Sequence, residues 1–151
     1  MINVQQELFT RPEEVTEYFL DDLRKSANLL GLEFVGGYGE RLVPAYPAVV
    51  VSAGPLDREL HGTHTYIVTL RCFLYVYHAS MVMTHASRSL EDLKLATSVV
   101  DFIERDPTLG NKIVQGWVSS EVPGVSQINN RKTDVVVSTR LTWEGITERR
   151  F

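Results

Sequence analysis

The chain has 151 residues, 44% of them hydrophobic and 23% charged, which is the length and composition of one ordinary globular domain with its own core. The net charge of -4 and the scattered lysines and arginines exclude the basic footprint with which a protein grips nucleic acid. The single cysteine, Cys72, excludes an internal disulfide, which suits a reducing cytoplasm.

The N-terminal stretch "MINVQQELFTRPEE" has neither the basic start nor the apolar run of a signal peptide. No segment approaches the ~20 consecutive apolar residues that a membrane span needs. We therefore expect a soluble, unsecreted protein with no membrane partner. One domain is expected over residues 1–151, with residues 1–9 and 144–151 as extended termini.

A helix is expected over residues 11–30. Thr10 stands three residues before Glu13, which is the spacing of a capping box, and Pro12 lies in the first turn. Apolar residues recur at helical spacing until Gly31, which marks the stop. These apolar residues are Val15, Phe19, Leu23, Ala27 and Leu30.

The next part of the chain is rich in glycine and proline. We expect a short strand at Leu32–Val35 within a turn-rich connection that runs to Pro47. The apolar run "AVVVSAG" at residues 48–54 predicts a strand covered on both faces. Residues 55–63 are polar and are interpreted as a loop.

Residues 66–77 alternate as a long strand. One face is wholly apolar, whereas the other begins polar and ends aromatic. The apolar face consists of Tyr66, Val68, Leu70, Cys72, Leu74 and Val76, and the other of Ile67, Thr69, Arg71, Phe73, Tyr75 and Tyr77. At ~3.3 Å per residue such a strand is ~40 Å long, about twice the usual length. We expect it to cross the whole domain or to protrude from it.

The aromatic side chains of Phe73, Tyr75 and Tyr77 need cover of their own, because the helices occupy the apolar face. Contiguous exposed aromatics usually mark an interface. Two other interpretations stay open. The loop at residues 36–46 or the C-terminal tail folds over these rings, or a bulge near Cys72 exchanges the two faces.

The second half of the chain predicts a helix and two strands. Ser89 is the expected N-cap of a helix that stops at Asp106–Pro107. Ile113–Val122 is interpreted as a strand broken at Pro123–Gly124. Alternation resumes in Thr133–Trp143, which has one wet and one dry face.

The elements follow the order α-β-β-β-α-β-β. Consecutive strands joined by short turns favour antiparallel pairing. We therefore predict an α+β fold, with an antiparallel sheet of four to five strands and two helices packed on it. A doubly wound parallel sheet needs more helices than this order contains.

The sequence contains no recognisable set of catalytic residues. The spacing of His61 and His64 can serve a metal, but a zinc site needs further ligands. The "GGYGE" stretch matches neither a P-loop nor a dinucleotide fingerprint, and no serine lies in a nucleophile elbow. We expect no enzyme activity, no metal and no cofactor. A small ligand- or metal-binding domain that uses His61, His64 or Glu59 is an alternative.

The ordered set of segments resembles the bacteriophage tail terminator family, also called tail-to-head joining or tail completion proteins. The resemblance is carried by the leading amphipathic helix, "YPAVVVSAG", "THTYIVTLRCFLYV", "LEDLKLATSVVDFIERD" and "TDVVVSTRLTWEG". These segments cover about residues 11–143. The chain departs from the family in the short basic turn "NNRK", where relatives often have a longer and more acidic connection.

The resemblance implies an α+β subunit that forms a closed ring, usually of six copies, on the end of a finished tail tube. Such a ring stops tube growth and joins the tail to the head connector, and DNA passes through its channel without specific binding. The implied location is the neck of the virion, after assembly in the host cytoplasm. The sequence also leaves open a head-completion or adaptor protein of the same neck, and a host adaptor domain that dimerises through a strand edge.

A ring with cyclic symmetry needs two different surfaces on each subunit. An aromatic half-face and an edge strand are expected to supply them. The candidate interface residues are Phe73, Tyr75, Tyr77, Arg71, Arg140, Trp143, Arg131 and Lys132. The chain end at Arg149–Phe151 is either a solvated tail or a segment that reaches across a neighbouring subunit.

Overall fold

The computed structural model describes residues 8–37, 43–80, 85–127 and 135–150. The elements in chain order are α1 (Pro12–Lys25), α2 (Ala27–Leu30), β1 (Phe34–Gly37), β2 (Ala48–Ala53), β3 (Asp57–Leu60), β4 (Thr65–Ser80), α3 (His85–Glu104), β5 (Gln115–Gln127) and β6 (Val135–Arg150). The predicted α+β class is confirmed. The described residues form six strands and three helices, more than the sequence led us to expect.

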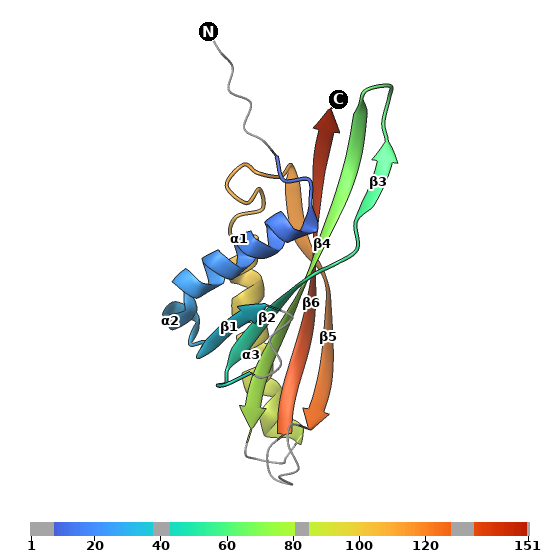
Figure 1. The fold of residues 1–151 in the computed structure, drawn as a ribbon. Helices are drawn as coiled ribbons and strands as arrows, with labels where there is room; N and C mark the ends of the chain where they lie inside the picture. The colour runs from blue at the N-terminus through green and yellow to red at the C-terminus, as the bar shows by residue number, and fades with distance from the viewer. Residues whose placement is uncertain (1–7, 38–42, 81–84, 128–134, 151) are drawn as a thin grey trace.

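All strands belong to one sheet with the order β1-β2-β4-β6-β5, and β3 pairs with β4 off this path. Every pairing is antiparallel except β1 with β2, which is parallel. Helices α1 and α3 pack against the same face of this sheet, as Figure 1 shows. The prediction that both helices lie on the sheet is therefore confirmed.

The centre of the sheet is the pair β4–β6. Their register runs from Thr65 opposite Arg150 to Ser80 opposite Val135 without a shift. The alternative interpretation, a bulge near Cys72 that exchanges the two faces, is therefore wrong. Figure 1 shows the β3–β4 turn and the end of β6 extending past α1, so of the two expected outcomes the long strand protrudes from the domain.

The predicted helix at residues 11–30 begins and ends as expected but is divided at Ser26. Gly31 closes it with a left-handed φ of 72°, a conformation that glycine adopts without strain. The predicted capping box is wrong. Arg11 is the N-cap without a side-chain cap, and Glu14 instead accepts a hydrogen bond of 3.3 Å from the backbone N–H of Thr10.

Two strands differ from their predictions because each lies at an edge of the sheet. The predicted loop at residues 55–63 contains β3, whose four side chains are all exposed and therefore show no apolar period. Strand β5 continues through Pro123–Gly124, where a break was predicted. Proline is tolerated there because the N–H it lacks lies on the open edge of the sheet.

The C-terminal segment is part of the sheet. The last strand was predicted to end at Trp143, but β6 continues to Arg150. Residues 144–150 pair with residues 65–71 of β4 in the same chain. They form neither a loose tail nor a segment that leaves its own subunit.

The core lies between the helices and the apolar face of β4. Both helices contribute buried residues, and Trp143 of β6 is among the largest of the fully buried side chains. Its ring meets the ring of Phe19 edge-on, with centroids 5.1 Å apart. The buried core residues of the helices are Val15, Phe19 and Leu23 of α1 and Ala96, Val99, Phe102 and Ile103 of α3.

Two glycines make room for the indole of Trp143. A Cβ added at Gly116 or Gly145 would overlap the six-membered ring of Trp143. Both glycines are buried in strands, where a side chain would normally improve stability. Their lack of a side chain is therefore explained by the space that the indole needs. The position of Trp143 in the core thus depends on two neighbours that have no side chain.

We expect Gly145→Ala to lower the free energy of unfolding by about 3 kcal/mol, because the methyl group overpacks the core against a rigid ring. Denaturant unfolding measures this change. Gly37→Ala is the control, since its Cβ meets only Leu20 at an ordinary 3.8 Å, and its change should stay within about 0.5 kcal/mol. Equal effects of the two substitutions would contradict this explanation of the glycines.

Candidate functional site

The described residues do not assemble a metal site. No group of three histidine, cysteine or acidic side chains among them comes together in a metal-binding arrangement. His61 and His64 lie exposed in the β3–β4 turn, and Glu59 is exposed on β3. The hypothesis that these residues bind a metal gains no support from their placement.

Cys72 is a core residue rather than a nucleophile. Its side chain is fully buried on the helix-covered face. Burial raises the pKa of the Cys72 thiol to about 12, although the Thr16 hydroxyl 3.9 Å away acts in the opposite direction. A thiol of this kind stays protonated at neutral pH and does not attack a substrate.

The candidate site is the sheet face opposite α1 and α3, which we term the open face. Residues directly opposite each other in neighbouring strands share a face, so the register assigns its members. They include Phe34, Gly36, Ala48, Val50, Ser52, Asp57, Glu59, Thr65, Ile67, Thr69, Arg71, Phe73, Tyr75, Tyr77, Gln115, Trp117, Ser120, Val122, Gly124, Ser138, Arg140, Thr142, Glu144, Ile146 and Glu148. None of the described helices lies on this face (Figure 1).

One half of the open face is an aromatic patch, which we define as Phe73, Tyr75, Tyr77, Arg140 and Val122. The three rings are half-buried in the single chain, and Val122 is 43% exposed. The rings of Tyr75 and Tyr77 stack with centroids 6.3 Å apart. The Arg140 guanidinium lies 5.7 Å from the centroid of Phe73, within reach of a cation–π contact.

Cross-strand neighbours of the aromatic patch form rows that run across the sheet. Tyr75 stands between Val50 of β2 and Arg140 of β6, and Arg140 is opposite Val122 of the edge strand β5. Val50 is buried, whereas Arg140 and Val122 are exposed. The patch is therefore well covered at β2 and open toward β5.

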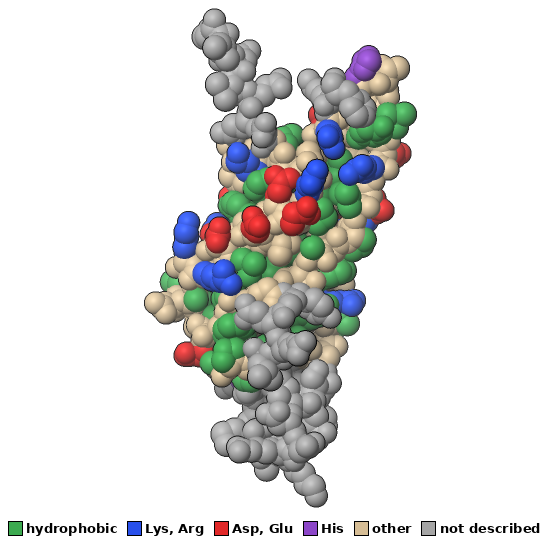
Figure 2. Space-filling view, viewed as in Figure 1, with side chains coloured by type: hydrophobic (Ala, Val, Ile, Leu, Met, Phe, Trp, Pro, Cys, Tyr) green, Lys and Arg blue, Asp and Glu red, His purple; other side chains and the backbone are tan. Residues whose placement is uncertain are grey.

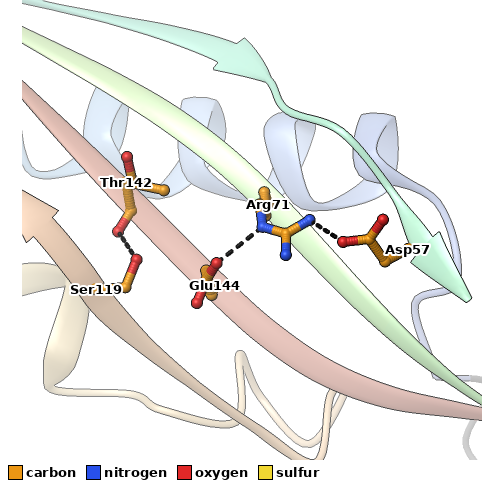
Figure 3. A network of polar contacts seen from close by, with 5 residues as sticks. All are labelled: Asp57, Arg71, Ser119, Thr142 and Glu144. Atoms are coloured by element: carbon orange, nitrogen blue, oxygen red, sulfur yellow. Dashed lines mark hydrogen bonds and ion pairs between the residues drawn. The ribbon is translucent and has the colours of Figure 1, made fainter. Parts of the chain in front are cut away.

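Arg71 forms the polar centre of the open face, between the aromatic patch and the β3–β4 turn. Its Nε donates to Glu144 Oε1 at 2.8 Å and its Nη1 donates to Asp57 Oδ2 at 2.5 Å, as Figure 3 shows. The hydrogen bonds to Glu144 and Asp57 raise the pKa of Arg71. One guanidinium thus connects three strands, β3, β4 and β6.

A β-bulge in the edge strand β5 lies near Arg71. Strand β5 shifts register between Val118 and Ser120, and the hydroxyl of Ser119 donates to the backbone oxygen of Thr142 at 3.3 Å (Figure 3). Bulges increase the local twist of an edge strand. Just before this bulge, Trp117 of the open face is 36% exposed.

The structure brings together five of the eight candidate interface residues. Phe73, Tyr75, Tyr77, Arg71 and Arg140 all belong to the open face.

The remaining three candidates are not part of this arrangement. The prediction that Trp143 is an interface residue is wrong. Trp143 stands opposite Cys72 on the helix-covered face and is only 1% exposed. Arg131 and Lys132 lie outside the described residues.

Sequence reasoning missed four further members of the face. Asp57 and Glu144 bind Arg71, and Trp117 and Val122 extend the exposed apolar area. The alternation in β6 would have placed Glu144 on the same side as Arg140. That Arg71 is its partner could not be predicted, because the sequence of neither strand alone specifies the register between β4 and β6.

No protein-family model matches this chain. A comparison with curated proteins finds no significant match. In the described part of the chain, no helix is long and apolar enough to cross a membrane.

We expect Arg71→Gln to lower the free energy of unfolding by about 1–2 kcal/mol, because Glu144, only 24% exposed, loses its charged partner. The loss should shrink in 1 M salt, which screens the interaction of the partly exposed charges. Denaturant unfolding at low and high salt measures both effects. Arg58→Gln, an exposed arginine on the same sheet, should change stability by less than about 0.5 kcal/mol. A loss independent of salt would count against an ionic contribution.

The buried thiol makes stability depend on alkaline pH. In the unfolded chain Cys72 ionises near its ordinary pKa of 9.0, whereas the folded chain holds it protonated until its pKa of about 12. The folded state is therefore favoured fully below pH 9 and loses stability as pH rises above it. Relative to Cys72→Ala, wild type should lose about 1 kcal/mol between pH 8 and pH 10. Parallel stability curves of the two proteins over this range would contradict the burial of the thiol.

Proposed function

We propose that this protein is a virion assembly subunit that forms a closed ring on the end of a bacteriophage tail tube. The ring stops polymerisation of the tube and joins the tail to the head connector. It acts by binding alone, and its place is the head-tail neck of the virion. Six copies is the expected number, as in the family that the sequence resembles.

The observation that carries this proposal is the half-exposed aromatic patch on the open face. Phe73, Tyr75 and Tyr77 lie on a face that none of the described helices covers. Aromatic side chains with arginine are enriched at protein interfaces, and Arg140 stands among these rings. A second copy that packs here would remove the patch from water.

The charge of the chain supports the passage of DNA rather than its capture. Six copies at -4 each carry a net charge of -24, so the ring has no excess of cations to neutralise phosphates. Binding of a phosphate backbone draws its affinity from such cations. This net charge is compatible with passage of DNA through the channel of the proposed ring.

We expect the wild-type protein to form rings, alone or after addition of tail tube protein. Size-exclusion chromatography with light scattering measures the mass, and negative-stain imaging shows the shape. Binding to tube ends and binding to the head connector are measured separately, since a neck adaptor binds the connector and not the tube. A strictly monomeric protein that neither caps tubes nor binds connector would end the proposal.

A charge inside the aromatic patch should prevent assembly. We expect Tyr75→Asp, and on the edge strand Val122→Asp, to weaken ring formation at least about tenfold, because each places a carboxylate in a desolvated contact. Leu29→Asp is the matched control, since Leu29 is an 83% exposed apolar residue on α2, away from the open face. Circular dichroism checks that each variant folds. Folded patch variants that assemble like wild type would show that the patch is not the contact.

A further inference from the structure

The sheet ends in an arm that extends past the helices. It consists of β3, residues 65–69 of β4 and residues 146–150 of β6, which pair side by side. The edge strand β5 reaches only as far as Ile146, so it does not flank the end of the arm. Figure 1 shows this three-stranded arm beyond α1. On the side of the helices, Val68 and Thr147 of the arm are buried, whereas Arg58, Leu60 and Arg149 on the same side are exposed.

The described side chains of the two faces of the arm carry opposite charges. The face continuous with the open face, here termed the acidic face, holds Asp57, Glu59 and Glu148 around Ile67. At its base Arg71 and Glu144 carry opposite charges. The described side chains of this face therefore have three more carboxylates than guanidinium groups.

The other side of the arm, here termed the basic face, holds Arg58 and Arg149. Both arginines are exposed, and no carboxylate of the described residues shares their face in the arm. Leu60 lies on the same face, in one row with Tyr66 and Arg149, and is 61% exposed. Figure 2, which views the molecule from the side of α1, shows blue side chains gathered at this upper end.

The alternation along two short segments produces this division. In β3 the order Asp57, Arg58, Glu59 places acid, base and acid on alternate sides. In β6 the neighbours Glu148 and Arg149 do the same, in the same sense, because Glu148 is opposite Ile67 and Arg149 is opposite Tyr66. Two strands that are far apart in sequence thus sort their charges onto the same two faces.

Two copies of the arm can meet edge to edge or face to face. Edge-to-edge pairing that continues the sheet keeps each face on one side, so it brings carboxylates near the neighbour's carboxylates and arginines near the neighbour's arginines. Like charges in such positions are destabilising. Face-to-face packing of an acidic face on a basic face places opposite charges together and also covers the exposed Leu60.

We propose that the acidic face of the arm in one copy packs against the basic face of the arm in the next copy. The occupant of each face is thus a second copy of this chain, because the two faces of one arm complement each other. The contact is heterologous, since every copy uses one face toward each neighbour, and such a contact forms a ring where the rotation between neighbours closes. This inference rests on the proposed ring and names a contact that directs its assembly.

Charge reversal of each face tests the contact in the full chain. One variant carries Arg58→Glu and Arg149→Glu, a second carries Glu59→Lys and Glu148→Lys, and a third combines all four. Each of the first two should assemble at least about tenfold less than wild type, because like faces then meet. An equal mixture of the two should assemble, since each keeps the native face that complements the other. The combined variant has the net charge of wild type and should assemble by itself.

The control is Glu17→Lys with Asp21→Lys on the exposed side of α1, which makes the same charge change as the second variant. It should assemble like wild type. Light scattering at low salt measures assembly, and thermal unfolding checks folding. If the combined variant does not fold, the mixture of the two double variants decides.

The outcomes separate this inference from the proposed function. A wild-type protein that never assembles overturns both. A wild-type ring that both double variants form equally well overturns the arm contact and leaves the proposed function standing. The arm contact is also overturned if the folded double variants lose assembly and neither their mixture nor the combined variant restores it. In that case each face binds something other than a second arm.

Discussion

The pairing of β4 with β6 determines which side chains lie on the helix-covered face of the sheet and which lie on the open face. The two strands face each other over 16 residues each, and no bulge interrupts their register. Side chains alternate strictly along such a pair, so a slip by one residue would move every one of them to the other face. Placing Trp143 against Cys72 under the helices therefore also places Arg140, Thr142 and Glu144 on the open face.

The length of this pair explains why the sheet exceeds its helical cover. A 16-residue strand is about 53 Å long, whereas the 20-residue helix α3 is about 30 Å long and the 14-residue α1 is shorter still. Helices of these lengths cannot cover the strands from end to end. The chain uses the helical layer for one core and leaves an arm of three strands beyond it, with charged side chains on both faces.

Much of this arrangement could be predicted from periods within single segments. The two faces of β4 and the buried stripe of α1 follow from local spacing, and Gly31 ends its helix as a left-handed glycine should. Contacts between segments could not be predicted in this way. The pairing of Arg71 with Glu144, the parallel β1–β2 pair and the exposed strand β3 depend on register and neighbours, which no single segment specifies.

Arg71 links the two parts of the open face in a way that bears on assembly. An aromatic patch can hold a neighbour tightly but selects its direction poorly, since apolar contact is not directional. Charges arranged on two unlike faces select direction and register more than they add affinity. The arm can do this only if β3 keeps its place beside β4, and the guanidinium of Arg71 binds Asp57 at the start of β3 and Glu144 of β6 together. A single guanidinium thereby fixes the acidic face of the arm relative to the aromatic patch, so that the proposed sources of affinity and of direction lie on one continuous surface.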